Sequence, residues 1–414
     1  SASFQIEDRI STTAKIRIRG TGSESDVQYI SANAFRIAGT LDVTAPESGQ
    51  LWYVGETNRV ITWDAIGTVP NVKVEYKTSV GGGFFTIAAN DAGHVPGSNT
   101  YAWTSGVADE KTETAYVQVC DARAGFTDIC NVSAAPFSIR PLFTVTSPTA
   151  GQRVVVGSSN AGLVKWTRVG TKTTTIDIKA DPNDGKGADG IPGNADDYPW
   201  TIATAVDAST GATGVAWNAI PDNISNNVKI RIQDPVQTQV TAFSPLFKIA
   251  GSLTLTDPPA NTYLNVSGSY LIKWTKVGSF PNVNIWYSTD GGTNFNNQIT
   301  ALTSAALLQY SWTNIPATPS NNVIIRVADT GDPDTKGLSG VSHIHRIYDI
   351  TQPETGEVLA TGGSFDIKWN TTGGTAANVK LQYATNGGGT AGNWADIPGA
   401  TNLVNANPGN FAWI

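Results

Sequence analysis

Short stretches in which apolar and polar residues alternate recur along the whole chain. Two clear examples are Ile61-Thr-Trp63 and Val72-Lys-Val-Glu-Tyr76, which have an apolar side chain at every second position. A period of two places these side chains on one face of a β-strand. Glycine-rich stretches such as Asp290-Gly-Gly292 follow several of the strands, and glycine readily adopts the positive φ angles of hairpin turns. The pattern predicts short antiparallel strands joined by tight turns.

The strand pattern is part of a longer repeat, and four copies of this repeat start within the chain. Each copy opens with an alternating segment that ends in proline, at residues 41–46, 143–148, 253–258 and, more loosely, 348–353. The four prolines are separated by 102, 110 and 95 residues. Self-similarity of this kind indicates one structural unit used several times.

Two tryptophans recur at matching positions in the copies. The first follows each proline by about 16 residues in an aliphatic-polar-Trp triplet, and the second lies later in the copy. The first set is Trp63, Trp166, Trp274 and Trp369, and the second set is Trp103, Trp217, Trp312 and Trp413. We expect these side chains to form the cores, because alternation puts each first tryptophan on the face of its aliphatic neighbour.

About seven short strands per hundred residues, bounded by turn signals, are typical of an antiparallel sandwich. We therefore expect an all-β protein of tandem Ig-like antiparallel β-sandwich repeats, each about 95–110 residues long. The expected complete repeats are residues 40–140, 141–250, which carries an acidic Gly/Asp insertion, and 251–348. The third is expected to close at His345-Arg-Ile347, by analogy with Phe137-Ser-Ile139.

The two ends of the chain match parts of a repeat. Residues 1–39 match the C-terminal half, since Phe35-Arg-Ile37 corresponds to Phe247-Lys-Ile249, and residues 349–414 match the N-terminal part. One explanation is a window cut from a longer array. The other is that the two halves complete each other between successive molecules, which would give a head-to-tail fibre by strand complementation.

Composition and charge narrow the class of protein. Charged residues make up only 15% of the chain, the formal net charge is -7, and the 27 basic residues are scattered, so nucleic acid is not an expected partner. No apolar run approaches the roughly 18–20 residues that a membrane span requires. Methionine is absent even from position 1, and the first residues do not form a signal peptide. We expect a processed or excised piece whose secretion signal or anchor lies elsewhere.

The copies share a pattern of Pro, Gly, Val-Gly, Ile-x-Trp and a Tyr-Ser-Thr-Asp-Gly-Gly turn. The first repeat carries it from Pro46 through Val54-Gly55 to Ile61-Thr-Trp63, and Tyr287-Ser-Thr-Asp-Gly-Gly292 carries the turn. This pattern resembles tandem Ig-like repeats of large prokaryotic cell-surface proteins, either S-layer-like or surface-filament proteins. The resemblance implies an extracellular, cell-surface location and a structural or adhesive role, and it transfers no functional residues.

The chain has two cysteines, Cys120 and Cys130, which bracket a predicted hairpin. Strands flanking such a hairpin come within bridging distance, so we expect a structural disulfide formed in an oxidising compartment. A redox-active pair would be closer in sequence, as Cys-x-x-Cys.

The second repeat replaces its short turn with a long acidic loop at residues 181–197. Alternating carboxylate and amide oxygens with intervening glycines suit calcium, although the order is not that of an EF-hand. The candidate ligands are Asp181, Asn183, Asp184, Asp189, Asp196 and Asp197. A solvated acidic turn is the alternative. A smaller acidic cluster at residues 329–334 is a weaker calcium candidate.

Three further features have structural or functional interpretations. Residues 288–295 resemble an Asp-box, an architectural hairpin motif, and no arginine and carboxylate set for glycoside hydrolysis accompanies it. His343 and His345 share a strand face and could hold a metal, although no third ligand is evident. His94 has no identifiable serine partner for a catalytic triad. We expect no enzyme activity.

The sequence contains candidate sites both for attached sugars and for contact with glycans. Sequons for N-glycosylation occur at Asn131, Asn223, Asn265 and Asn370, so the chain can be a glycoprotein. Four tryptophans lie outside the repeated positions and are candidates for glycan contact or for a seam between domains: Trp52, Trp200, Trp286 and Trp394.

The sequence therefore predicts a non-enzymatic structural protein of the cell surface. Its expected partners are further copies of itself, in a homopolymer or lattice, and cell-surface glycans. The alternative is an adhesin stalk or spacer that presents a binding tip outside this segment.

Overall fold

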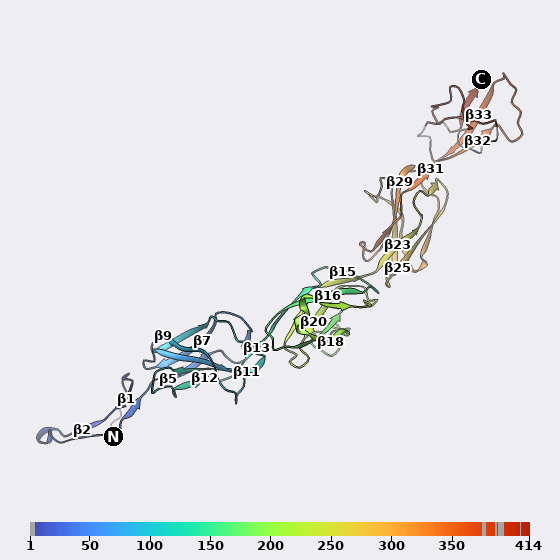
Figure 1. Cartoon of the computed structure of the whole chain (residues 1–414). Coiled ribbons are helices and arrows are strands. Elements are labelled where there is room, and N and C mark those ends of the chain that lie inside the picture. Colours follow the sequence, from blue (N-terminus) through green and yellow to red (C-terminus); the bar gives the residue numbers. More distant parts are fainter. Residues whose placement is uncertain (1–4, 375–377, 386, 388–392, 406) are drawn as a thin grey trace. The chain divides into compact units, whose positions relative to one another are not determined.

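The computed structural model describes residues 5–374, 378–385, 387, 393–405 and 407–414. Regular structure in these residues is β-strand apart from short 3-10 turns at Gly22–Glu24, Ala208–Ala212 and Ala305–Leu307 (Figure 1). The all-β fold class predicted from the alternating pattern is confirmed. The chain forms two compact units, one of Ser1–Gln152, Asn160–Asn218 and Asn227–Phe247, the other of Arg153–Ser159, Ala219–Asn226 and Lys248–Ile414.

The first complete repeat is a sandwich of two sheets. Its strands are β5 (Thr40–Ala45), β6 (Leu51–Tyr53), β7 (Arg59–Ile66), β8 (Asn71–Lys77), β9 (Phe85–Ala92), β10 (Gly97–Trp103), β11 (Thr112–Asp121), β12 (Cys130–Val132) and β13 (Phe137–Arg140). One sheet has the order β10-β7-β5, and the other has the order β6-β13-β11-β8-β9, with β12 also pairing with β11. Neighbouring strands are antiparallel except β6 and β13, which are parallel. This two-sheet arrangement is Ig-like.

The next two repeats use the same strands in the same order. In the second repeat they are β14 (Leu142–Ser147), β15 (Arg153–Val155), β16 (Asn160–Val169), β17 (Thr175–Asp181), β18 (Trp200–Asp207), β19 (Val215–Trp217), β20 (Ser225–Gln233), β21 (Thr241–Phe243) and β22 (Phe247–Ala250). In the third they are β23 (Ser252–Asp257), β24 (Tyr263–Asn265), β25 (Tyr270–Val277), β26 (Asn282–Ser288), β27 (Asn297–Ser304), β28 (Gln309–Trp312), β29 (Ser320–Asp329), β30 (Lys336–Leu338) and β31 (Ser342–His345).

The third repeat closes earlier than its sequence indicated. Its last strand is β31, in which Ile344 pairs with Leu264 just as Ile139 pairs with Trp52 in the first repeat. Ile347, which the sequence comparison placed at the end of this repeat, begins the first strand of the next copy. The comparison with Phe137-Ser-Ile139 failed because Ser342 stands where the other repeats have phenylalanine.

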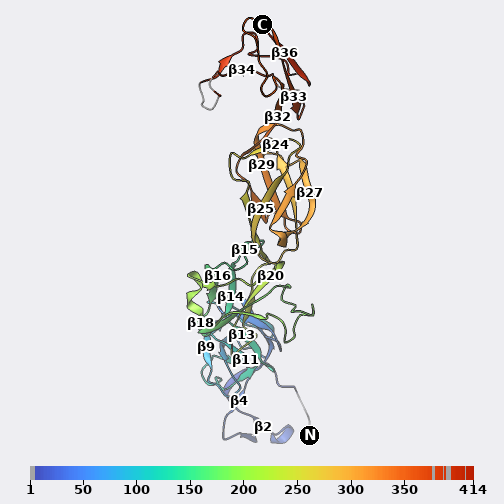
Figure 2. The same cartoon turned by 90° about the vertical axis from the view of Figure 1, so that its right-hand side faces the viewer.

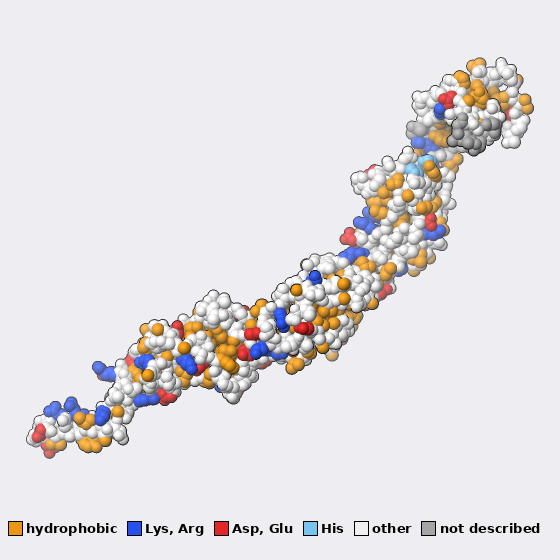
Figure 3. Space-filling view, viewed as in Figure 1, with side chains coloured by type: hydrophobic (Ala, Val, Ile, Leu, Met, Phe, Trp, Pro, Cys, Tyr) orange, Lys and Arg blue, Asp and Glu red, His pale blue; other side chains and the backbone are white. Residues whose placement is uncertain are grey.

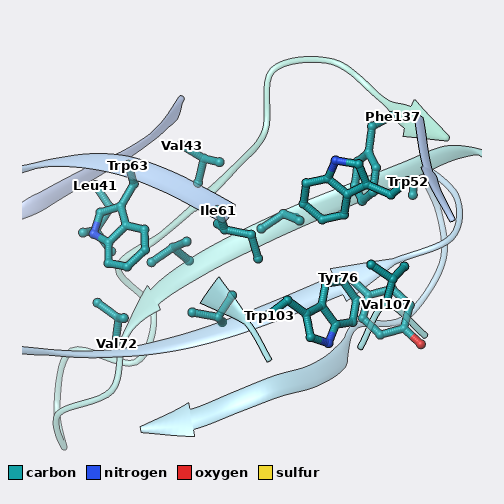
Figure 4. Packing of buried hydrophobic residues seen from close by; sticks show 14 of the residues in the cluster. Leu41, Val43, Trp52, Ile61, Trp63, Val72, Tyr76, Trp103, Val107 and Phe137 are labelled. Atoms are coloured by element: carbon teal, nitrogen blue, oxygen red, sulfur yellow. The ribbon is translucent and has the colours of Figure 1, made fainter. Parts of the chain in front are cut away.

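Seven of the eight repeated tryptophans are buried in the cores, as predicted, and the eighth, Trp413, is half-buried against its cluster. Trp63 and Trp103 are buried between the two sheets of the first repeat (Figure 4). Trp52 is also buried there, with its ring centroid 4.7 Å from that of Phe137, so its assignment as a candidate for glycan contact is wrong. Trp200 and Trp286 are half-buried, and Trp394 is exposed.

Residues 5–39, the N-terminal half-repeat, reproduce the closing strands of a complete repeat. They form β1 (Ser11–Ala14), β2 (Arg17–Arg19), β3 (Gln28–Ile30) and β4 (Phe35–Ile37). Strand β1 pairs with β4, and β2 pairs with β3. The Ser11 to Ile37 register matches that of Thr112 to Ile139, so β1 and β2 together correspond to β11.

Residues 347–414, the C-terminal half-repeat, reproduce the opening strands. They form β32 (Ile347–Gln352), β33 (Phe365–Thr372), β34 (Gln382–Tyr383), β35 (Ala395–Asp396) and β36 (Gly409–Trp413). One sheet has the order β32-β33-β36, whose strands are labelled in Figure 2. Strands β34 and β35 form a separate two-stranded sheet. Strands β32, β33 and β36 correspond to β5, β7 and β10, and strands β34 and β35 correspond to β8 and β9. The copy begins at Ile347 rather than at residue 349.

Candidate functional sites at junctions and loops

A hydrogen-bonded contact joins the first complete repeat to the second. Asp109 lies in the loop before β11, and Thr171 lies in the loop after β16. The backbone N–H of Thr171 donates to Asp109 Oδ1 at 2.9 Å, and its hydroxyl donates to Oδ2 at 2.6 Å. The preceding Gly170 has a φ of 97°, and a Cβ there would lie 3.0 Å from the Asp109 carboxylate, so glycine permits the close approach.

The same contact occurs at two other junctions. The N–H and hydroxyl of Thr68 donate to Asp8 at 2.9 and 2.6 Å, and those of Ser279 donate to Asp222 at 2.8 and 2.6 Å. We call this arrangement the junction clasp: an aspartate of one repeat that accepts two hydrogen bonds from a Ser or Thr of the next. Hydrogen bonds to a carboxylate are stronger than those between neutral groups, so each clasp restrains the loops that it joins.

The junction before the C-terminal half-repeat is built differently. Ala317 follows Ile315-Pro316 where Asp222 follows Ile220-Pro221, and Gly374 stands in the position of Ser279. Instead, Arg346 Nε donates to the carbonyl oxygens of Gly373 and Gly374 at 3.2 and 3.1 Å. The clasps were not predicted from the sequence, although a Gly-Ser or Gly-Thr pair recurs at the matching position of three copies.

A partly buried ion pair reinforces the junction of the first and second repeats. Lys111 Nζ lies 2.6 Å from Asp234 Oδ2, and the hydroxyl of Thr173 donates to the same oxygen at 2.9 Å. Burial opposes ionisation of Asp234, but the hydrogen bond from Lys111 and those from nearby groups outweigh it, so the pKa of this carboxyl is lowered. In the other unit, Lys248 and Asp332 form a comparable pair at 2.5 Å.

Acid should weaken the clasp of Asp109. Burial opposes ionisation of this carboxyl, but the hydrogen bonds from Thr171 outweigh it and lower its pKa. Because the folded pKa is below the unfolded one, the stabilisation is present above about pH 4 and is lost as pH falls through the folded pKa. Thermal unfolding should therefore show wild type more stable than Asp109→Asn near neutral pH, with the difference shrinking below about pH 4. A difference that is constant down to about pH 2.5 would contradict this assignment.

The predicted disulfide is present. Cys120 in β11 and Cys130 in β12 stand directly opposite each other in the antiparallel pair and are bonded. The bond ties the β11–β12 hairpin, and the neighbouring residue Asn131 connects β12 to β5, because its Oδ1 accepts the N–H of Val43 at 2.8 Å. Its position indicates a structural role.

Loss of this disulfide should destabilise the first repeat by about 2–3 kcal/mol, because closure of a short loop restricts the unfolded chain. The measurement is chemical denaturation of Cys120→Ala/Cys130→Ala against wild type. Wild type treated with reductant should move to the stability of the double variant, and the variant itself should not respond to reductant. An unchanged unfolding midpoint in both experiments would show that the bond contributes nothing.

In the acidic loop of the second repeat, carboxylates accept hydrogen bonds from backbone N–H groups of the same loop. Asp181 is fully buried, and its Oδ2 accepts the N–H groups of Gly187 at 2.9 Å and Tyr198 at 3.0 Å. Asp196 Oδ2 accepts the N–H of Ala188 at 2.7 Å, and Asp184 forms an ion pair with Lys229 at 2.8 Å.

The remaining candidate ligands make similar local bonds. Asp189 accepts from Ile191 and Asn194, Asp197 accepts from Gly193, and the side chain of Asn183 donates to the carbonyl of Gly187. Within the described part of the chain, no three His, Cys, Asp or Glu side chains come together as a metal-binding group. Calcium binding by this loop stays a prediction.

The Asp-box hairpin is a compact turn. Ser288 is buried, and its Oγ accepts the N–H of Gly292 at 2.9 Å. Asp290 accepts the backbone and side-chain N–H groups of Asn294 at 3.0 and 2.8 Å. Hydrogen bonds from Ser288 and Asn294 lower the pKa of Asp290 to about 2. The motif thus closes the β26–β27 hairpin.

The histidines have aromatic or acidic neighbours. The rings of His343 and His345 lie 5.7 Å apart on β31, and Tyr263 on the parallel strand β24 lies 5.2 and 4.7 Å from them. His94 is 2.8 Å from Asp91 and contacts the ring of Trp63 at 4.8 Å between centroids. All three histidines therefore pack against aromatic side chains. Metal binding at His343 and His345 stays a prediction.

Three of the four sequons are accessible. Asn223, Asn265 and Asn370 are exposed, whereas Asn131 is half-buried beside Val43. None of the helices in the described residues has the length and apolar character that crossing a membrane requires.

No protein-family model matches the chain, and no curated protein matches its sequence. Among solved structures it is similar to the CbhA fibronectin(III)-like modules of Clostridium thermocellum, with 15% identity, a TM-score of 0.18, and coverage of 49% of this chain and 93% of that one. It is similar to a Dscam structure at 10% identity, 77% of each chain and a TM-score of 0.24. It is also similar to an I-band fragment from titin, with 8% identity, coverage of 75% of this chain and 99% of that one, and a TM-score of 0.23.

Such TM-scores carry no argument about function. The strand order and register of the repeats define the class of protein: a chain of tandem Ig-like β-sandwiches.

Proposed function

We propose that this chain is a non-enzymatic structural protein of the cell surface that assembles with itself into a surface layer or an extracellular filament. The observation that carries the proposal is the row of successive Ig-like sandwiches held together by the junction clasps of Asp8, Asp109 and Asp222. Repeated modules in which each unit contacts its neighbours are typical of proteins that span distance or cover a surface.

The surroundings support an extracellular setting. Disulfides such as Cys120–Cys130 persist in oxidising compartments, and Ig-like sandwiches are common in extracellular and cell-surface proteins. The exposed sequons allow attached sugars, and Trp394 offers an exposed indole for contact with cell-surface glycans. Calcium in the loop of residues 181–197 is part of this proposal as a restraint on a long surface loop.

An adhesin stalk is the second candidate. The junction clasps favour it, because a spacer must hold successive repeats at defined angles. The clasps serve a filament equally well, so they do not separate the two functions. Self-association does.

The test is electron microscopy and sedimentation of the purified chain over a range of concentrations, with calcium and after chelation. Ordered polymers are expected. If these polymers loosen when calcium is chelated, calcium takes part in holding them together. Separate particles at all concentrations under both conditions would overturn self-assembly and leave the stalk.

A further inference from the structure

A long segment of the third repeat carries no charged residue. Residues 291–325 contain no Asp, Glu, Lys, Arg or His, although 15% of the whole chain is charged. This uncharged segment includes β27, the 3-10 turn Ala305–Leu307 and β28. Molecules with the same net charge repel each other, and this chain has a formal net charge of -7. An uncharged surface is therefore a place where two copies can approach closely.

The uncharged segment forms one open side of the sandwich. Strand β27 ends the sheet of order β24-β31-β29-β26-β27, and β28 ends the sheet of order β23-β25-β28. The turn Ala305–Leu307 joins these two end strands, so both border the same side. The pairing of β27 with β26 is interrupted by two register shifts, and an irregular edge strand hinders extension of the sheet by another strand. Contact at this side therefore depends on side chains.

Three leucines are exposed on this side. Leu302 in β27 is 62% exposed, and Leu307 and Leu308, at the end of the turn, are 61% and 43% exposed. The core holds the turn in place, because the indole N–H of Trp274 donates to the carbonyl of Ala305 at 3.2 Å and its backbone N–H donates to that of Leu308 at 3.0 Å. Hydrophobic side chains reach the surface of this repeat (Figure 3). We call the surface formed by Leu302, Leu307 and Leu308 the leucine face.

The first two repeats differ on the matching side. Asp91 lies in β9 and Asp207 lies in β18, the counterparts of β27. The shared strand register makes Asn90 and Ala205 the counterparts of Leu302. A charge on an edge strand discourages association with another molecule. The third repeat has a leucine in place of a polar or small residue and no charge in this strand, so its side is the one suited to association.

The polar groups beside the leucine face can pair with identical groups. Asn297 and Gln298 in β27 and Gln309 in β28 have amide side chains, which carry both donors and acceptors. A surface of lysines or aspartates would instead need the opposite charge on its partner. Lys273 in β25 stands opposite Gln309, but Asp257 lies 3.1 Å from it, so this charge is already balanced. These properties favour a second copy of the chain as the partner.

We propose that the third repeats of two copies pack against each other through their leucine faces, related by a twofold axis. In such a contact each surface meets the identical surface, and Leu302, Leu307 and Leu308 of both copies become buried. This inference rests on the proposed self-assembly and names one of its interfaces. A twofold contact closes after two copies, so it gives a lateral pair, and a layer or filament needs a second, different contact.

Analytical ultracentrifugation of a leucine variant tests the contact. Leu307→Asp should weaken dimerisation by about tenfold or more, because the interface would bury a charge in place of an apolar side chain. Leu307 is exposed in the single chain, so the variant should fold, and circular dichroism checks this. Val95→Asp is the matched control, because Val95 is 58% exposed between β9 and β10, the corresponding place in the first repeat. Equal dimerisation of the two variants would overturn the assignment.

Cysteine cross-linking tests the twofold geometry. The two native cysteines are bonded to each other, so Ala306→Cys introduces a single free thiol. Ala306 is exposed beside Leu307, and oxidation should therefore link two copies through the same residue, as seen on a non-reducing gel. Ser209→Cys is the control, because Ser209 follows the buried Ala208 in the second repeat as Ala306 follows the buried Ala305. Equal yields of linked dimer from both variants would contradict a specific contact in the third repeat.

The outcomes separate this inference from the function on which it rests. Wild-type dimers that Leu307→Asp abolishes, without larger polymers, would support the contact and count against a layer or filament. Polymers that persist in Leu307→Asp, without the cross-link of Ala306→Cys, would refute the contact while self-assembly stands. A wild-type chain that stays monomeric at all concentrations would refute both.

Discussion

Replacing Lys111 by methionine should lower the free energy of unfolding of the second repeat by about 3 kcal/mol, because it leaves the buried carboxylate of Asp234 without its charged partner. Asp234, the partner, is only 2% exposed. It would keep the hydroxyl of Thr173 and the N–H groups of Val236 and Gln237, but these donors carry no net charge. Chemical denaturation gives the loss, and hydrogen exchange followed by mass spectrometry should localise it to β17 and β20.

Two comparisons make this prediction specific. Lys172→Met is the matched control, because Lys172 is exposed and 3.9 Å from Glu110, and it should change stability by no more than about 0.5 kcal/mol. Adding Asp234→Asn to Lys111→Met should recover much of the loss. The penalty should also fade as acid protonates Asp234. Equal effects of Lys111→Met and Lys172→Met would show that the pair does not stabilise this junction.

Replacing Trp274 by alanine should destabilise the third repeat by about 3–5 kcal/mol, through lost burial and the cavity left behind. Trp274 is buried in the core cluster, and its indole N–H donates to the carbonyl of Ala305 at 3.2 Å. Hydrogen exchange of β25, β26 and β29 should report the change, because the repeats need not unfold together.

Trp394→Ala is the control for this substitution. Trp394 is 48% exposed, so its loss should leave stability within about 0.5 kcal/mol of wild type. If a glycan binds this chain through an exposed indole, its affinity should fall in Trp394→Ala and not in Trp274→Ala. Comparable loss of stability in both variants would contradict the assignment of Trp274 to the core.

Local sequence patterns were sufficient for much of the fold. Alternation around Trp63 and Trp166 predicted buried strands, and the glycine turn at Asp290-Gly-Gly292 predicted a hairpin that the structure contains. These features depend on residues close together in the chain. The pairing of Cys120 with Cys130 is also local, since both flank one hairpin.

Local patterns failed where pairing partners are distant. Trp52 lies between apolar neighbours, Leu51 and Tyr53, so alternation did not identify its buried face, which the parallel pairing of β6 with β13 determines. The close of the third repeat was misplaced because Ser342 lacks the aromatic signal. Only its pairing with β24 identifies the strand.

The candidate sites divide in the same way. Candidate ligands such as Asp181 and Asp196 were selected by composition, but the structure shows their carboxylates accepting bonds from the loop backbone. The clasps escaped notice because Asp109 and Thr171 are 62 residues apart, and a single aspartate gives no signal of a partner that distant.

The sequence by itself determined the period of the repeats, the all-β class, the core tryptophans and the disulfide, because these follow from side-chain spacing within and between neighbouring strands. Only the tertiary structure decided which loops meet at a junction and which strand closes the third repeat. Both depend on contacts between segments far apart in the chain, and hydrophobic burial alone is non-directional. Strand register and paired charges supply the missing direction.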